Sequence, residues 1–336
     1  MANRYWVGGT GTWDAVNVLN WSLTSGGVGG APVPTAADIA IFNASSGVGT
    51  VTLAADATVF SMTFSGSSIT TFDWNNHKIN LAGNAATLYV GNAAVAMLNN
   101  PTINATYSGS TGTRTITGGV GIAESNAVNV NITAGTDTVA LGTGNNTYKN
   151  VNFTGFSGTL AAGNRRLYGG IIYSAAMTVA ASSGGLIFAA TSGTHTITAA
   201  NQEVDGLMTF SGGASFEFTN AVRLTAARTL TVSAGSVKFR DGATSSAGAF
   251  MFTGTSSSQI IIGSTTPGAQ FTLSDPSGTN TAAYTTISDS IATGGATWNA
   301  FTTNGNIDAG NNLGWDFSTQ IGKYIYTVRK NKRILP

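Results

Sequence analysis

The sequence predicts an all-β protein whose body is a right-handed parallel β-helix; an array of β-sandwiches is the alternative. Three observations lead to this prediction. Of 336 residues, 44 are Gly, and only 9% are charged, where a typical soluble domain has ~25% charged residues. Short apolar segments with a period of two, separated by Gly-, Asn- and Ser-rich turns, fill most of the chain. Both ends of this body are rich in aromatic residues.

The composition also argues against helices and against disorder. Glu and Lys, which usually solvate helix surfaces, are scarce, so no helix longer than a turn or two is expected. Thr, which is abundant, favours pleated surfaces because its branched Cβ restricts χ1. A hydrophobic content of 42%, with 9% aromatic residues, predicts a packed core rather than a disordered chain.

Residues 1–45 are predicted to form an N-terminal cap. Trp6, Trp13 and Trp21 follow one another at intervals of seven and eight residues, with a Gly-rich turn after the first. We expect these indole rings to cover an open hydrophobic end of the stack. The alternative is a tryptophan platform that binds sugar.

Residues 46–290 are predicted to form the β-helix body. A recurring phrase places a Phe just before a small residue and a Gly corner, as in Thr63-Phe-Ser-Gly66 and Thr209-Phe-Ser-Gly212. Its interval is loose, which suits a solenoid whose coils differ in loop length. Phe, Ile, Leu and Val are expected to form ladders inside, and Thr and Asn to line the outer sheets. Short strands, low charge and imperfect repetition favour the solenoid over β-sandwiches. The segments that we expect as strands include 49–53, 58–64, 78–81, 87–90, 113–117, 128–132, 148–153, 186–188, 194–198, 207–210, 229–232, 236–239 and 259–262.

The rhythm breaks after residue 284, and residues 291–318 are predicted to form a C-terminal cap. Trp298, Phe301, Trp315 and Phe317 would close this end, since an open end of a solenoid exposes both core and strand edge.

Charge separates residues 319–336 from the rest as a basic tail. Up to residue 320 there are 10 basic and 14 acidic residues, a net charge of −4, whereas five basic residues and no acidic ones follow. Such a tail is typical of a solvated terminus or a docking arm, and less often of nucleic-acid binding.

The alternating segment Tyr324-Ile-Tyr326-Thr-Val could add a strand to a neighbour's sheet. The residues assigned to docking are Tyr324, Tyr326, Arg329, Lys330, Lys332 and Arg333.

Several classes of protein are disfavoured. The chain has no Cys, which excludes a disulfide framework and thiolate metal sites. No apolar run approaches the ~18 residues that span a bilayer. The first residues do not look like a secretory signal, so we expect assembly inside a cell and release with a larger particle.

Residues that could carry chemistry are few. His77 and His195 lie in separate repeats and are interpreted as surface residues. Glu203 and Asp205 would share one strand face and could serve glycoside hydrolysis, although two solvated acids are the simpler interpretation. No catalytic residue, metal site or cofactor is therefore predicted. One corner could bind carbohydrate, through Asp73, Trp74, Asn75 and Asn76, because rings stack on sugar faces and amides bond hydroxyls; a loop that packs its Trp on the wall is the alternative.

The two ends of the body resemble a known kind of protein. The opening Tyr5-Trp-Val-Gly-Gly-Thr-Gly-Thr-Trp-Asp14, with Asn20-Trp21 and Pro34-Thr-Ala-Ala-Asp38, resembles the start of β-helical surface proteins of tailed phages and of autotransporter-like adhesins. The closing Gly294-Gly-Ala-Thr-Trp298 and Gly310-Asn-Asn-Leu-Gly-Trp315 look like the end segment of similar proteins. These motifs cover about a fifth of the chain, and they imply a β-helix on the outside of a virion or cell.

The resulting functional expectation is a non-enzymatic structural protein of a phage virion, in a tail fibre, spike or tail tip that recognises the host. The alternatives are a capsid decoration or head-fibre protein, a tailspike polysaccharide depolymerase, and a bacterial β-helical adhesin. Expected partners are other virion proteins, copies of the chain itself, such as in a trimer, and host surface glycan. Membrane insertion and nucleic acid are not expected.

Overall fold

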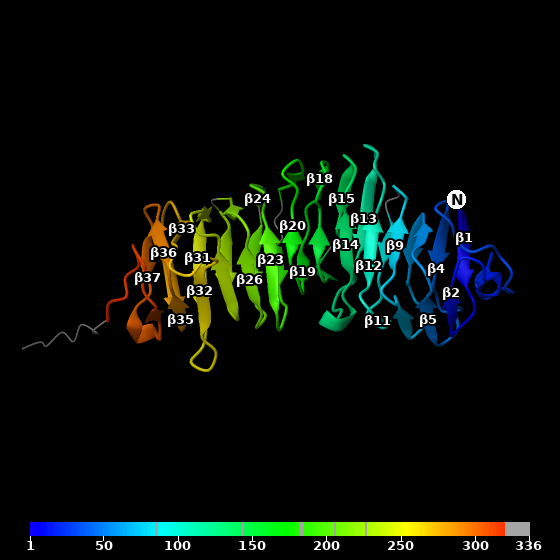
Figure 1. The fold of residues 1–336 in the computed structure, drawn as a ribbon, viewed down its shortest axis with the longest axis horizontal. Coiled ribbons are helices and arrows are strands. Elements are labelled where there is room, and N and C mark those ends of the chain that lie inside the picture. Colours follow the sequence, from blue (N-terminus) through cyan, green and yellow to red (C-terminus); the bar gives the residue numbers. More distant parts are fainter. Residues whose placement is uncertain (85–86, 143, 182–184, 205, 226, 320–336) are drawn as a thin grey trace, which may run out of the picture.

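The chain winds into a long rod with its N-terminus at one end (Figure 1). The structure is a computed structural model that describes residues 1–84, 87–142, 144–181, 185–204, 206–225 and 227–319. Strands recur mostly in sets of three along the chain. Apart from the antiparallel β3 and the breaks after β11 and β21, each strand pairs in parallel with the corresponding strand of the next coil. The predicted parallel β-solenoid is thus confirmed, and the sandwich alternative is excluded, since its sheets would be antiparallel.

Three walls enclose the core. The first wall consists of a 9-stranded sheet followed by a 5-stranded one, the second of a 4-stranded sheet followed by an 8-stranded one, and the third is one 12-stranded sheet. The first wall comprises β1 (Ala2–Trp6), β3 (Trp21–Ser22), β4 (Asp38–Ile41), β7 (Ser61–Thr63), β10 (Tyr89–Val90), β13 (Thr113–Thr117), β15 (Thr138–Ala140), β18 (Thr159–Leu160) and β21 (Thr178–Val179), then β24 (Glu203–Val204), β27 (Arg223–Leu224), β30 (Thr244–Ser246), β33 (Phe271–Ser274) and β36 (Ser290–Thr293). The second wall comprises β2 (Gly11–Trp13), β5 (Thr50–Leu53), β8 (Thr71–Asp73) and β11 (Ala96–Leu98), then β16 (Asn146–Tyr148), β19 (Arg165–Leu167), β22 (Gly185–Phe188), β25 (Leu207–Phe210), β28 (Thr229–Val232), β31 (Ala249–Thr253), β34 (Thr279–Ala283) and β37 (Thr297–Asn299). The third wall comprises β6 (Ala57–Val59), β9 (Lys78–Leu81), β12 (Thr102–Ala105), β14 (Asn129–Ile132), β17 (Val151–Asn152), β20 (Ile171–Ile172), β23 (Thr194–Thr198), β26 (Ser215–Phe218), β29 (Ser236–Phe239), β32 (Ile260–Ser264), β35 (Thr285–Ile287) and β38 (Ile307–Asp308).

Alternation within each strand decides which residues face the core. In β28, Leu230 and Val232 are fully buried, whereas Thr229 and Thr231, which alternate with them, are partly exposed. This follows because successive side chains of a strand point to opposite faces. Short 3-10 helices interrupt the coils at η1 (Val18–Asn20), η2 (Glu124–Asn126) and η3 (Thr302–Asn304).

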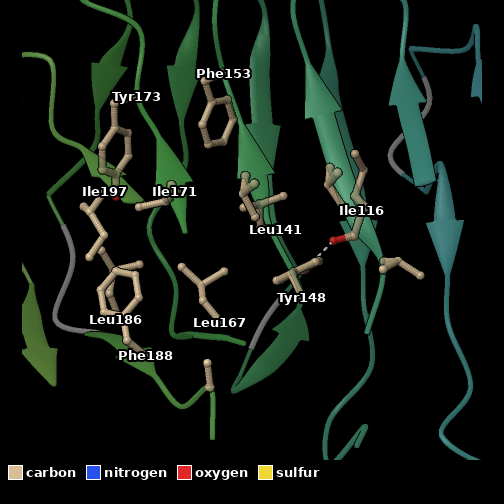
Figure 2. Packing of buried hydrophobic residues seen from close by; sticks show 14 of the residues in the cluster. Ile116, Leu141, Tyr148, Phe153, Leu167, Ile171, Tyr173, Leu186, Phe188 and Ile197 are labelled. Carbon is tan, nitrogen blue, oxygen red and sulfur yellow. Dashed lines mark hydrogen bonds between the residues drawn. The ribbon is translucent and has the colours of Figure 1, made fainter. Parts of the chain in front are cut away.

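Aromatic side chains in equivalent positions stack from coil to coil. The rings of Phe188 and Phe210, on the paired strands β22 and β25, lie 4.8 Å apart at 10°, and those of Phe218 and Phe239, on the paired strands β26 and β29, lie 5.3 Å apart at 20°. These separations are close to the ~4.8 Å between neighbouring strands. Figure 2 shows the same in-register packing in the middle of the rod, where aliphatic and aromatic side chains of successive coils fill the interior. The predicted interior ladders are confirmed.

Asn residues form a matching ladder on the outside of the third wall. The Asn104 Nδ2 donates to Asn80 Oδ1 at 3.0 Å, and the Asn131 Nδ2 donates to Asn104 Oδ1 at 2.9 Å. Each amide has both a donor and an acceptor, so identical side chains one coil apart satisfy each other. The predicted lining of the outer sheets by polar, uncharged side chains is therefore present here.

The two ends of the rod differ. At the N-terminal end, β3 pairs antiparallel with β1, and the rings of Trp6 and Trp13 contact Trp21 at 5.2 and 5.0 Å. All three indoles are buried, as the cap interpretation requires, so they offer no platform for sugar. At the C-terminal end, Trp315 packs on Trp298 at 5.0 Å but stays only partly buried. Strands of the stack run through both predicted caps, since β1 pairs with β4 and β35 with β38.

A buried ion pair interrupts the apolar core. Arg114 and Asp137 have fully buried side chains, and Arg114 Nε and Nη2 donate to the two carboxylate oxygens at 2.7 Å each. Arg114 Nη2 also donates to the Ala134 carbonyl oxygen, and the guanidinium lies 5.5 Å from the Tyr107 ring centroid. A buried pair gains little over apolar residues, whereas a lone buried charge is costly, so the two side chains depend on each other.

Removing one partner should therefore be far more harmful than removing both. We expect Arg114→Met to lower the free energy of unfolding by about 3–5 kcal/mol, and Arg114→Met with Asp137→Leu to recover most of that loss. Denaturant unfolding followed by circular dichroism measures this. The matched control is Lys238→Met, which breaks the partly exposed pair with Glu217 and should cost at most about 1 kcal/mol. Equal losses for the single and double variants would contradict the expectation.

Candidate functional site

A hollow of about 340 Å³ opens near the N-terminal end, where the second wall turns into the third. Three segments enclose it: the turn after β2, the loop before β4, and the corner between β5 and β6. The in-register pairing of Trp13 with Leu53 places the first and third of these segments one coil apart. The lining residues are Trp13, Asp14, Ala15, Val33, Pro34, Thr35, Ala36, Ala55, Asp56, Ala57 and Thr58.

Two carboxylates fix the loops around this hollow. Asp14 Oδ1 accepts hydrogen bonds from the backbone N–H groups of Val16 at 2.8 Å and Asn17 at 2.6 Å. Asp56 Oδ1 accepts from the N–H of Lys78 at 3.0 Å and lies 3.4 Å from His77 Nδ1. Each carboxylate thus uses one oxygen to order the corner, and no hydrogen bond between its Oδ2 and another described residue is found.

A third carboxylate anchors the loop that forms the remaining side of the hollow. Asp38 Oδ2 accepts from the backbone N–H of Thr35 at 3.1 Å and from its hydroxyl at 2.8 Å, and Arg4 Nη2 lies 3.7 Å from Oδ1. Burial opposes ionisation of Asp38, but the Thr35 hydrogen bonds and the Arg4 charge outweigh it and lower its pKa below the usual 3.8.

This lowered pKa gives a pH dependence whose sign is fixed. A carboxylate with a depressed pKa in the folded state stabilises the fold above its unfolded pKa of ~3.9 and loses that contribution as pH falls through the folded value. Asp38→Asn should therefore lower the free energy of unfolding by about 1 kcal/mol at pH 7, and the difference from wild type should shrink below about pH 3.9. Denaturant unfolding at several pH values measures it; a difference that stays constant into acid would contradict the assignment.

The chemistry of the hollow suits a neutral polyhydroxyl ligand. Carboxylate oxygens and hydroxyls, from Asp14, Asp56, Thr35 and Thr58, stand among apolar side chains. Such a mixture of apolar surface and a few polar groups is typical of small-molecule sites, and the volume lies at the small end of their range. Carboxylates accept hydrogen bonds from sugar hydroxyls, while the apolar lining packs on the carbon face of a ring.

The predicted carbohydrate corner lies next to this hollow, one coil along. Asp73 Oδ1 accepts from the N–H of Asn75 at 2.8 Å and from Asn99 Nδ2 at 2.7 Å. Asn75 and Asn76 take positive φ values of 48° and 62°, a conformation that Asn tolerates better than most residues. The corner reaches the hollow through the contact of His77 with Asp56.

Trp74 does not fit the predicted role. Its side chain is fully buried, with its Nε1 3.5 Å from Met97 Sδ and its ring 5.3 Å from that of Phe72. A ring in the core has no free face for a sugar, so the alternative interpretation, packing on the wall, holds for Trp74. The prediction that Asp73, Asn75 and Asn76 bind carbohydrate stays a prediction.

The other sequence candidates are not brought together. His195 lies in β23, several coils away from His77, and its Nε2 is 3.0 Å from the Ser192 carbonyl oxygen. Glu203 is exposed in β24, whereas Asp205 lies outside the described residues, as do all six tail residues assigned to docking. Among the residues that the structure describes, there is no group of three or more His, Cys, Asp or Glu that could hold a metal ion. No helix in the described ranges is long and apolar enough to cross a membrane.

Comparison with known proteins leaves the site to be judged on its own chemistry. No protein-family model, curated protein or solved structure matches this chain. Asp14 and Asp56, which sequence reasoning did not select, carried one signal: each lies within three residues of the end of a second-wall strand, β2 or β5, and Asp73 ends the next strand of that wall, β8.

A bulky side chain at the rim tests the hollow. Ala36 lines it and is exposed, so Ala36→Trp should fill it without disturbing the core. We expect the affinity for a neutral oligosaccharide to fall at least about tenfold, which corresponds to ~1.4 kcal/mol, as measured by isothermal titration calorimetry. The matched control is Ala37→Trp, because Ala37 is also exposed but lies outside the lining. Equal affinities for the two variants would reject the hollow as the binding site.

Proposed function

We propose that this chain is a non-enzymatic structural protein on the outside of a phage particle, in a tail fibre, spike or tail tip that recognises the host. The observation that carries this proposal is the rod itself. A 12-stranded parallel sheet runs along it, the Asn ladder on the outside of this sheet is polar and uncharged, and buried Trp residues cover one end. An elongated solenoid of this kind is suited to displaying binding surfaces at a distance from its attachment point.

The motifs at the two ends support the same setting. The opening segment that resembles β-helical phage surface proteins supplies β1 and β2, and the closing one supplies β37 and the turn that carries Trp315. In this proposal the hollow beside Asp14 and Asp56 contacts a host surface glycan.

Immunolabelling tests where the protein is located. Antibodies raised against the purified chain should label isolated virions at the tail when viewed by electron microscopy. Labelling of the head instead would favour a capsid decoration or head-fibre protein. Labelling of the bacterial cell wall, with none on virions, would reject the phage proposal in favour of a bacterial adhesin.

A polysaccharide depolymerase is the second candidate, and one observation favours it. Asp14 and Asp56 line the same hollow, and a pair of carboxylates is what glycoside hydrolysis uses. Incubating the purified chain with host envelope polysaccharide should release no reducing ends if the protein only binds. Release that Asp14→Asn and Asp56→Asn abolish would establish the enzyme instead.

The basic tail is proposed to dock the chain onto other subunits. Charge steers residues 319–336 toward the net-negative body of another copy or another virion protein, with a range on the order of 10 Å at physiological salt. Deleting residues 319–336 should leave the far-ultraviolet circular dichroism of the rod unchanged and abolish incorporation into particles. Replacing Arg329, Lys330, Lys332 and Arg333 by Gln removes the positive charge but keeps the alternating segment 324–328, so this variant tests the role of charge alone. Normal incorporation of the deletion variant would show that the tail has no docking role.

A further inference from the structure

A segment in the middle of the rod leaves the solenoid and crosses the second wall. Between β11 and β16 the described part of this wall has no strand. Its place is taken by residues 118–127, here called the strap, which include η2. Gly118 lies so close to the wall that there is no room for a Cβ beside the Thr147 carbonyl oxygen. The Gly119 N–H donates to Asn146 Oδ1 at 3.0 Å, and the Gly119 carbonyl accepts from the Thr147 N–H at 2.9 Å.

Long-range contacts hold the strap from both sides. Glu124 Oε2 accepts from the Thr191 hydroxyl at 2.8 Å and from its N–H at 3.2 Å, across 67 residues of sequence. In the other direction, Asn126 Oδ1 accepts from the Met97 N–H at 3.4 Å. The strap therefore spans from β11 to the turn after β22, and its conformation is set by contacts with several coils.

A hollow of about 330 Å³ lies between the strap and the second wall. Its strap side is formed by residues 120–123, and its wall side by Asn145, Arg166 and Tyr168. Arg166 occupies the outward position of β19, whose other two residues are buried. Tyr168 follows β19 directly and is partly exposed.

Two polar groups here have no partner in the part of the chain that the structure describes. The Arg166 guanidinium makes no ion pair or hydrogen bond with a described residue. Thr147, its neighbour in register on β16, is 0% exposed, and its hydroxyl has no hydrogen-bond partner. Thr147 is not among the residues that line the hollow, so the case for a ligand rests on Arg166.

We propose that this hollow binds a carboxylated sugar residue of an acidic polysaccharide. A guanidinium presents two parallel N–H donors that match a carboxylate, while the Asn145 amide and the Tyr168 hydroxyl suit sugar hydroxyls. Val120 and Ile122 supply apolar contact for the ring. The choice of a sugar over a free anion rests on the proposed host-recognition function; the anion chemistry rests on Arg166 alone.

Calorimetry with the full-length chain tests the proposal. The probes are uronic-acid and sialic-acid oligosaccharides, the same oligosaccharides with methyl-esterified carboxylates, and inorganic phosphate. We expect at least one acidic probe to bind, and its methyl ester to bind at least tenfold more weakly. Arg166→Gln should weaken binding of the acid at least tenfold. Arg223→Gln, at the exposed start of β27 on the first wall, is the matched control and should change it less than twofold.

Each other outcome overturns the proposal. Failure of every acidic probe, equal binding of acid and ester, or equal loss in the two Arg variants would reject a carboxylated-sugar site at Arg166. Phosphate binding with the same dependence on Arg166, without sugar binding, would show a site for free anions only. Tyr168→Phe, which keeps the ring, provides a second variant if Arg166→Gln does not fold. Tail labelling of virions is measured separately, so the host-recognition function can stand even if this site fails.

Discussion

In-register stacking of short parallel strands is the constraint on which the rest of this molecule depends. Each coil hydrogen-bonds to the next at an equivalent position, so that inward residues form columns, as Val130, Val151 and Ile171 do, and outward residues form others. A coil alone cannot bury its apolar side. Because a shift of one residue would turn every side chain to the other face, the register is fixed by the columns themselves, and the walls need few charged residues.

The corners between the walls carry the carboxylates of the hollow near the N-terminal end. Coils differ in length: Val151 pairs with Ile171, 20 residues on, while Ala105 pairs with Ile132, 27 residues on. The extra residues leave the stack between strands, where the backbone needs side-chain acceptors such as those of Asp14 and Asp73. Those acceptors have further lone pairs available, which makes a corner that is ordered for structural reasons also suitable for a ligand.

The sequence was sufficient to predict the solenoid and its interior, because the period-two pattern and the Phe-Gly phrase report local geometry directly. Phe64 and Phe210 are fully buried, as that phrase predicts. The sequence left Trp74 open between sugar binding and packing on the wall, because a Trp beside polar residues has the same pattern whether its ring points in or out. Arg114 was not foreseen in the core, since its partner Asp137 is 23 residues away and alternation alone predicts an apolar residue at such a position. The hollow at Asp14 and Asp56 required knowing the register of two coils whose lengths sequence does not specify.

The break in the second wall has a mechanical consequence. Hydrogen bonds between coils run along the rod, so a pull on its two ends loads them in series, and the rod yields where a cross-section has fewest of them. Among the described residues the third wall is continuous from β6 to β38, whereas the first wall has no strand pairing between β21 and β24 and the second lacks a strand between β11 and β16. A rod under tension should therefore yield first at these two cross-sections. The hydrogen bond from Thr191 to Glu124 connects the strap to coils beyond the gap in the second wall and so reinforces the rod there. A rod of this construction that is pulled from its two ends would thus extend first at internal breaks, away from both ends.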